Sequence, residues 1–324
     1  MRKNVSEQAD SFSSKVKTEL SGLKIKRFED ARALLCAFTL GIGTLKFVPG
    51  KKSWGVHYSI KSRDAIELCA KLCAQYYALE FAVSEVKHER LNANNCELIV
   101  YGGGIDEFMC SVGMMSLDEN GEKLFSPSVP LDAVRTDTQK RAFIRGLFLA
   151  CGTVSDPEKA YHLEFVINNE ALAEKAFEIL YSYDIPPNRS KRRSSAVMYV
   201  KEGEKLEDLL AFIGASEGMM RVSQERIIKQ AKNRANRYVN CTEANANRSA
   251  DAARKQLENI ELLLKTLGAE ALGEELKVVA LSRMNNPELS LSELADELEM
   301  GRSAVNYRLK KLERIAEEIR GREK

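Results

Sequence analysis

The sequence lacks any apolar run approaching the roughly 20 residues that a membrane-spanning helix needs. Its first 14 residues are polar and charged and lack the apolar core of a signal peptide. Proline is scarce, with 7 residues against 19 glycines, and 44% of the 324 residues are hydrophobic. This balance excludes a disordered or collagen-like chain. We therefore expect a globular, cytoplasmic protein with no membrane partner.

Cysteine and histidine are also few. The seven cysteines are an odd number, so a complete set of intrachain disulfides is excluded, and most of them lie inside apolar runs. This placement indicates reduced, buried thiols. The three histidines, His57, His88 and His162, lie far apart in the sequence. We expect no zinc site, no histidine-based catalytic site and no cofactor.

The sequence has little net charge, only +2, because 47 acidic residues offset 49 basic ones. The distribution is uneven. Nine basic and three acidic residues lie between Arg221 and Lys255, and five basic residues and one acidic residue lie between Met300 and Arg314. Such clusters are typical of a surface that binds a polyanion, and a solvated helical face is the alternative.

Two segments, Leu34–Leu45 and Phe143–Val154, resemble each other with an offset of 109 residues. Each has small residues four positions apart, so that they share one face of a helix, and a glycine follows two residues later. The small residues are Ala37 and Gly41 in the first segment and Gly146 and Ala150 in the second. The pattern predicts two helices that pack closely against each other.

Each repeat continues with an alternating strand pattern, a helix and a further strand. These elements are Trp54–Ile60, Ser62–Tyr77 and Glu97–Tyr101 in the first repeat, and Tyr161–Ile167, Asn169–Tyr183 and Ser195–Val200 in the second. The duplication predicts an α+β domain with two pseudo-symmetric halves. The expected domains are an N-terminal helical segment (1–20), the α+β domain (21–215, with halves of about 21–110 and 130–215), a basic helical linker (216–270) and a helix-turn-helix domain (271–324).

Strand patterns end at Ser216. We expect two helices, Gln224–Asn240 and Asn247–Leu267, separated by a break at Cys241–Ala246. The first mixes cations with amides, which suits contacts with phosphates, although a solvated linker helix would look the same. Its candidate DNA-binding residues are Arg226, Lys229, Lys232, Arg234 and Arg237.

The segment Leu291–Leu312 reads as a helix-turn-helix. Ser290 or Ser292 can cap its first helix, Gly301 breaks that helix, and the next begins near Ser303.

In the second helix, Arg302–Arg314, the residues Val305, Leu309 and Leu312 form an apolar stripe. The opposite face offers the donors that base edges and phosphates accept. Its candidate DNA-binding residues, together with the neighbouring cations, are Arg302, Ser303, Asn306, Tyr307, Arg308, Lys310, Lys311 and Arg314. A protein-binding three-helix bundle with a polar outer face is the alternative.

The two repeat helices, which end in Gly41-Ile-Gly43 and Ala150-Cys-Gly152, resemble the LAGLIDADG helices of homing endonucleases. In that family, the acid before the final glycine binds the divalent metal and drives phosphodiester hydrolysis. Here Ile42 and Cys151 take these positions, and neither offers the oxygen ligands that Mg²⁺ requires. The resemblance implies a degenerate nuclease scaffold with no catalytic residues, no bound metal and no enzymatic activity. A nuclease using other carboxylates, such as Asp106 or Asp156, is the alternative.

A LAGLIDADG-like domain followed by a helix-turn-helix resembles the bacterial WhiA family. The resemblance rests on the segments Ser11–Leu20, Arg141–Gly152, Asp156–Glu164, Arg234–Asn245 and Arg302–Leu309. It implies a nucleoid-associated regulator of transcription that binds double-stranded DNA, with roles in cell division, chromosome segregation and, in some lineages, sporulation. Other division or transcription proteins are candidate partners. A nucleoid or division-associated protein that binds DNA without sequence preference is the alternative.

Overall fold

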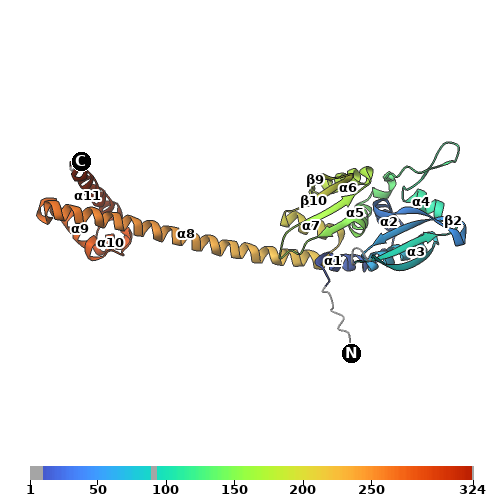
Figure 1. Cartoon of the computed structure of the whole chain (residues 1–324), viewed down its shortest axis with the longest axis horizontal. Coiled ribbons are helices and arrows are strands. Elements are labelled where there is room, and N and C mark those ends of the chain that lie inside the picture. Colours follow the sequence, from blue (N-terminus) through green and yellow to red (C-terminus); the bar gives the residue numbers. More distant parts are fainter. Residues whose placement is uncertain (1–9, 89–92, 323–324) are drawn as a thin grey trace, which may run out of the picture. The chain divides into compact units, whose positions relative to one another are not determined.

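A computed structural model describes residues 10–88 and 93–322. The chain divides into two compact units, one ending at Lys229 and the other beginning at Gln230 (Figure 1). In the described part of the chain, no helix is long and apolar enough to cross a membrane.

The N-terminal unit contains the expected duplication. After α1 (Phe12–Ser21), the first half comprises α2 (Phe28–Ile42), β1 (Thr44–Val48), β2 (Ser53–Ile60), α3 (Arg63–Tyr77), β3 (Glu80–His88) and β4 (Ala93–Tyr101). The second half comprises α5 (Asp137–Cys151), β7 (Gly152–Val154), β8 (Leu163–Ile167), α6 (Glu170–Ser182), β9 (Asn188–Arg192) and β10 (Ser195–Val200). Their antiparallel sheets have equivalent strand orders, β1-β2-β4-β3 and β7-β8-β10-β9. The α+β fold class and the two halves are therefore confirmed.

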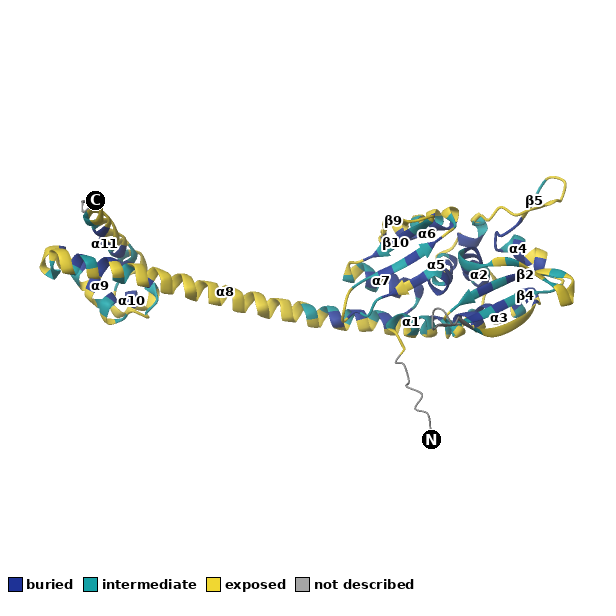
Figure 2. Ribbon diagram, viewed as in Figure 1, coloured by how far each residue is buried: buried dark blue, intermediate teal, exposed yellow. Residues whose placement is uncertain are grey.

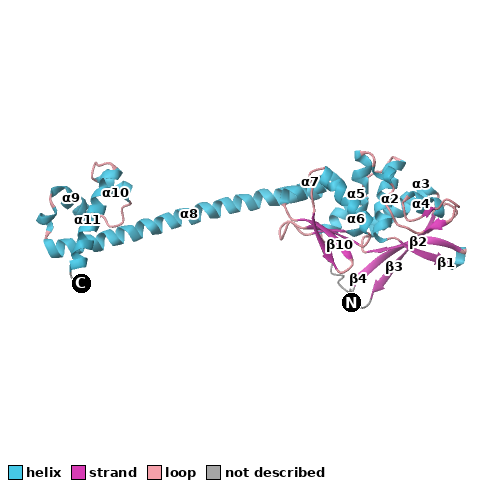
Figure 3. Cartoon of the chain, turned by 90° about the horizontal axis from the view of Figure 1, so that it is seen from above, coloured by secondary structure: helices cyan, strands magenta, loops and turns pink. Residues whose placement is uncertain are grey.

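Shorter elements join the halves and close the unit. They are α4 (Ile105–Ser111), β5 (Ser116–Leu117), β6 (Lys123–Leu124) and α7 (Gly203–Ile213), with 3-10 turns at Pro49–Lys51 and Leu131–Val134. Figure 3 shows helices α2, α3, α5 and α6 on one side of the two sheets.

The strands β3 and β9 are absent from the sequence-based expectation. Both lie at an edge of their sheet, and every residue of β9 is exposed. Edge strands often carry charged side chains that discourage pairing with other chains, and the sequence of β9, Asn-Arg-Ser-Lys-Arg, fits this rule. An edge strand of this kind has no apolar alternation to reveal it.

The helices α2 and α5 pack directly against each other at the centre of the unit, and both are largely buried (Figure 2). Gly41 faces the end of α5, because a Cβ at this position would lie 2.8 Å from Cys151 Sγ and 3.3 Å from Ala150 Cβ. A Cβ at Gly146 would overlap the backbone of Leu34. The predicted close packing of the small-residue faces is confirmed.

The expected break at Cys241–Ala246 is wrong, because α8 runs without interruption from Ser216 to Leu267. The segment contains no glycine or proline, the residues that most often end a helix. The Thr242 hydroxyl donates a 2.9 Å hydrogen bond to the carbonyl of Tyr238, one turn earlier. The polar side chain is thus satisfied within the helix.

The C-terminal unit adds three helices to the end of α8. They are α9 (Glu274–Asn285), α10 (Leu291–Glu297) and α11 (Arg302–Arg322), preceded by a 3-10 turn at Ala269–Leu272. Their core includes Ile260 and Leu263 of α8, Val279 of α9, Leu294 of α10 and Val305 of α11. The C-terminal part of α8 therefore belongs to this core. The exact domain boundaries stay predictions.

Candidate nucleic-acid interface

The helix α10 begins with a capping box. The Ser290 hydroxyl oxygen accepts the backbone N–H of Glu293 at 3.3 Å, and the Glu293 carboxylate accepts the backbone N–H of Ser290 at 2.8 Å. Hydrogen bonding of the carboxylate by the Ser290 side chain and by the Ser290 backbone N–H lowers the pKa of the Glu293 carboxyl group. Of the two serines proposed as caps, Ser290 is the one used.

The turn between α10 and α11 does not depend on Gly301, the residue that the sequence predicts as the helix breaker. Its left-handed residue is Glu299, with φ at 48°, whereas Gly301 has no positive φ. The backbone N–H of Met300 donates a 2.9 Å hydrogen bond to the carbonyl of Ala295, which closes the turn. Helix α10 therefore ends before Gly301 is reached, and α11 begins at Arg302.

A buried arginine ties the loop between α9 and α10 to the core. The side chain of Arg283 is only 2% exposed. Its Nη1 donates to the carbonyl oxygens of Leu289, at 2.5 Å, and Asn286, at 3.5 Å. Burial lowers the pKa of this guanidinium group. The arginine fixes where α10 starts, and no sequence signal marked it, because a buried and an exposed arginine look alike in the sequence.

The two faces of α11 differ as the sequence predicts. Val305, Leu309 and Leu312 are buried in the core. Tyr307 is 66% exposed and Asn306 is half-buried. The other exposed candidates are Arg302, Ser303, Lys310, Lys311 and Arg314. Hydroxyl, amide and cationic groups thus cover the outside of the helix.

Arg308 differs from the other candidates because its side chain turns inward and is only 22% exposed. One guanidinium nitrogen lies 3.6 Å from Met300 Sδ, and the other lies 3.9 Å from the Glu275 carboxylate. This side chain braces the turn against α9. Its contact with DNA stays a prediction.

A groove of about 380 Å³ separates α11 from the C-terminal part of α8. Asn306 and Lys310 line it from α11, and Arg248 and Lys255 line it from α8. Arg248 and Lys255 belong to the basic cluster of Arg221–Lys255 but are not among the DNA-binding residues predicted from the sequence. Their proximity to α11 depends on how α8 packs, which the sequence does not reveal.

The five candidates in the preceding part of α8 fall into two groups. Arg226 forms 2.7 Å ion pairs with Glu204 and Glu207, and Lys229 donates to the carbonyl of Pro157 at 2.6 Å. These two cations are held within the N-terminal unit. The exposed members are Lys232, Arg234 and Arg237.

The positions of the nuclease acids hold half-buried Ile42 and Cys151. Burial raises the pKa of the Cys151 thiol to about 12, so the sulfur stays protonated at neutral pH. A hydrocarbon and a neutral thiol do not fit a hard divalent cation such as Mg²⁺. Residues 10–88 and 93–322 contain no cluster of three His, Cys, Asp or Glu side chains placed to hold a metal.

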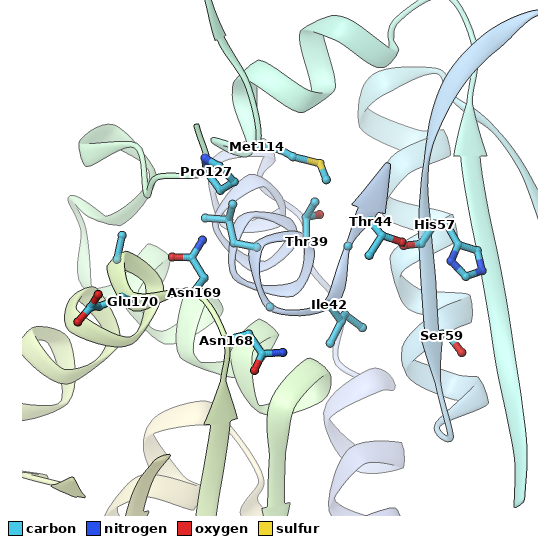
Figure 4. A pocket seen from close by; sticks show the side chains of 14 residues that line it. Thr39, Ile42, Thr44, His57, Ser59, Met114, Pro127, Asn168, Asn169 and Glu170 are labelled. Atoms are coloured by element: carbon cyan, nitrogen blue, oxygen red, sulfur yellow. The ribbon is translucent and has the colours of Figure 1, made fainter. Parts of the chain in front are cut away.

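A cavity of about 970 Å³ opens at the end of α2 (Figure 4). Ile42, Thr44 and His57 line it from the first half of the unit, and Asn168 and Glu170 line it from the second. The His57 Nε2 atom lies 3.2 Å from the Glu97 carboxylate. The cavity therefore spans the junction between the two pseudo-symmetric halves.

Comparison with known proteins identifies both parts of the chain. A model of the WhiA LAGLIDADG-like domain matches residues 140–232, and a model of the WhiA C-terminal HTH domain matches residues 235–316. A probable cell division protein WhiA from Clostridium novyi (strain NT) is 37% identical over 314 residues, which cover 96% of this chain and 98% of the relative. Its counterpart from Clostridium tetani is 36% identical over 315 residues, covering 95% and 98%.

Among solved structures, the crystal structure of full-length DUF199/WhiA from Thermatoga maritima is similar to the chain. The two are 25% identical, with a TM-score of 0.57, and the match covers 95% of this chain and 99% of that one. The similarity extends over both units and agrees with the family resemblance seen in the sequence. The chain therefore belongs to the WhiA family, with a LAGLIDADG-like domain and a C-terminal helix-turn-helix domain.

Proposed function

We propose that this protein is a non-catalytic regulator of transcription that binds double-stranded DNA through its C-terminal unit. The observation that carries the proposal is the two-sided character of α11. Its apolar stripe anchors the helix in the core, while Ser303, Asn306, Tyr307 and Lys310 remain available on the outside. This arrangement suits a recognition helix in the major groove.

In this proposal, the residues of α11 divide into two roles. Asn306 reads a base edge, because its amide offers both a donor and an acceptor. Lys310, Lys311 and Arg314 contact phosphates, together with Arg248 and Lys255 from the other wall of the groove. Lys232, Arg234 and Arg237 extend the row of phosphate contacts along α8.

The absence of catalysis is also part of the proposal. It is supported by the chemistry of Ile42 and Cys151, which leaves no oxygen ligands at the two positions where the nuclease acids would stand. The family relatives are named probable cell division proteins. We propose that this chain likewise acts in cell division and chromosome segregation, at the nucleoid in the cytoplasm.

The test is a binding titration of the full chain against genomic promoter fragments and random duplexes. It is run at about physiological salt with Mg²⁺, and the DNA is then checked for nicks. Intact DNA with tighter binding to particular promoters supports the proposal. Cut DNA would show an active nuclease, and equal affinity for all duplexes would show a binder without sequence preference.

A further inference from the structure

A second cavity of the N-terminal unit, of about 480 Å³, lies where α1 and α3 begin and α5 ends. Most of its lining side chains are hydroxyls, amides or amines. The lining residues are Ser11, Ser13, Ser14, Lys17, Ile60, Lys61, Ser62, Asn95, Ala150 and Thr153. We call it the Lys17 cavity.

The Lys17 cavity has two ammonium groups and no carboxylate in its lining. Lys17 Nζ donates a 3.0 Å hydrogen bond to the carbonyl of Leu149 at the end of α5. Within the described residues, neither Lys17 nor Lys61 has a carboxylate within ion-pairing distance. Asp64, on the adjacent turn of α3, accepts the hydroxyl of Thr18 and is not part of the lining. Besides the Leu149 carbonyl, Lys17 Nζ has the ring of Phe148 as a neighbour, with the centroid at 5.8 Å, but no negatively charged neighbour in the described part of the chain.

Desolvation lowers the pKa of the Lys17 ammonium group to about 8. The neighbouring Cys151 thiol does not compensate the charge, because its own pKa is raised to about 12 and the group stays neutral. A partly buried cation without a counter-charge is unfavourable, and an anion in the cavity would relieve this penalty.

The serine hydroxyls supply further donors. Ser11 Oγ accepts the N–H of Ser14 at 3.1 Å, Ser13 Oγ accepts the N–H of Val154 at 3.3 Å, and Ser62 Oγ accepts the N–H of Ala65 at 3.3 Å. Each oxygen already acts as an acceptor of a backbone proton, so its own O–H remains to donate elsewhere. The cavity therefore offers a surplus of donors, which matches the several acceptor oxygens of a phosphate group.

The other half of the unit provides an internal comparison. Ser62 caps α3 as Asn169 caps α6, and Ala150 stands where Gly41 stands in the first repeat. The equivalent location is the cavity of Figure 4, which is lined by Asn168, Asn169 and Glu170 and by no lysine. The duplicated fold therefore forms two equivalent cavities, each lined from both halves, and of these two only the Lys17 cavity is lined by lysines.

We propose that the Lys17 cavity binds a phosphate monoester of about nucleotide size. Its volume is within the range of roughly 300–1,000 Å³ typical of small-molecule sites and exceeds the space that a phosphate ion alone would fill. Lys17, Lys61 and the serine hydroxyls contact the phosphate group. Ile60 and Ala150 provide apolar surface for the organic part of the ester. The site lies wholly in the N-terminal unit and goes beyond the proposed binding of DNA.

The test uses isothermal titration of the full chain with AMP, adenosine and inorganic phosphate as probes. AMP is expected to bind, inorganic phosphate to compete with it, and adenosine to have no effect. Lys61→Gln and Lys17→Met are each expected to weaken AMP binding roughly tenfold, because each removes a charged contact with the phosphate. The matched control is Lys26→Gln, at an exposed lysine outside the cavity, which should bind AMP as the unaltered chain does.

Since Lys61 is exposed, its variant is expected to fold even if Lys17→Met does not. The proposal is overturned if AMP does not bind, whether or not inorganic phosphate does, or if Lys61→Gln binds AMP as tightly as the Lys26→Gln control. A titration of the same variants with duplex DNA shows whether the phosphate that the cavity binds belongs to a small monoester or to the DNA backbone. If Lys61→Gln weakens duplex binding while AMP does not bind, the cavity takes a DNA phosphate and the monoester proposal is wrong. Failure of the proposed regulator would instead appear as absent duplex binding with AMP binding intact.

Discussion

Gly146 of α5 lies directly on the backbone of Leu34 in α2. A Cβ added to this glycine would overlap the Leu34 carbonyl oxygen and would stand 2.9 Å from its carbonyl carbon. No flexible side chain can move aside here, because the obstructing atoms belong to a helix backbone. The two central helices can be this close only because position 146 has no side chain, and this contact brings the two halves of the N-terminal unit together.

Gly146→Ala is therefore expected to lower the free energy of unfolding by at least about 2 kcal/mol, since the helices must separate to accept the methyl group. Urea unfolding followed by the fluorescence of Trp54, the single tryptophan, measures the change. Gly50→Ala is the control, because a Cβ at that position meets no atom within 4 Å. Equal stability of the two variants would show that the helices are not held at this contact.

The turn before α11 carries a residue in an unfavourable conformation. Glu299 has φ at 48°, a region that suits glycine better than residues with a side chain. Glu299→Gly is expected to stabilise the C-terminal unit by up to about 1 kcal/mol. Glu297→Gly, at the last residue of α10, should instead destabilise it by a similar amount, about 1 kcal/mol. Hydrogen exchange of the α10 and α11 backbone amides measures the stability of both variants. Slower exchange in Glu297→Gly than in Glu299→Gly would contradict this account of the turn.

Lys310→Ala is expected to weaken binding to all duplexes to a similar degree. If the ammonium contacts one phosphate, its loss reduces the slope of log affinity against log salt by about 1. Titrations at several salt concentrations measure the slope. Lys277→Ala is the control, because the ammonium group of Lys277, on α9, forms a 2.6 Å ion pair with Glu270. An unchanged slope in Lys310→Ala would remove Lys310 from the phosphate contacts.

Lys17 gives the stability a distinct pH dependence. Burial lowers the pKa of its ammonium group from 10.5 to about 8. The unfolded chain keeps this proton up to pH 10.5, whereas the folded chain releases it above pH 8. Burial of the charged ammonium group therefore destabilises the folded chain fully below pH 8. This destabilisation disappears as the pH rises to 10.5.

Lys17→Met removes this titration, so its stability relative to the unaltered chain should fall by about 3 kcal/mol between pH 7 and 10.5. Urea unfolding in phosphate-free buffer at several pH values checks this. Cys151 faces the same ammonium group, but its thiol pKa of about 12 in the folded state lies above the window. A stability difference that is independent of pH would show that Lys17 is already solvated in the folded protein.

The features that could be predicted from the sequence are those with a periodic or repeated pattern. The small residues of the two repeat helices and the apolar stripe of Val305, Leu309 and Leu312 each repeat at helical spacing, and the structure confirms both. The features that the sequence did not predict lack such a pattern. The edge strand β9 carries no apolar alternation, and the segment 241–246 looked like a break although it contains no glycine or proline.

The candidate site likewise has features that the sequence predicts and features that it does not. The sequence identifies which residues of α11 face outward, because helical geometry alone decides this. It does not tell an exposed cation from one held inside the molecule. Arg308 and Arg226 are both engaged by neighbouring side chains, and Arg283 is buried. Whether an arginine meets a carboxylate depends on segments far away along the chain, so these partners become visible only in the folded protein.

In the proposed function, α11 reads the DNA sequence through Asn306. The most direct measurement compares the affinity of Asn306→Ala and the unaltered chain for a preferred promoter fragment and for a random duplex. We predict a loss of roughly 10- to 100-fold on the promoter fragment, since a bidentate amide contact contributes about 1–3 kcal/mol of discrimination, and little change on the random duplex. Asn285→Ala, at an exposed asparagine of α9, should change neither affinity. Equal losses on the two duplexes in Asn306→Ala would contradict the claim.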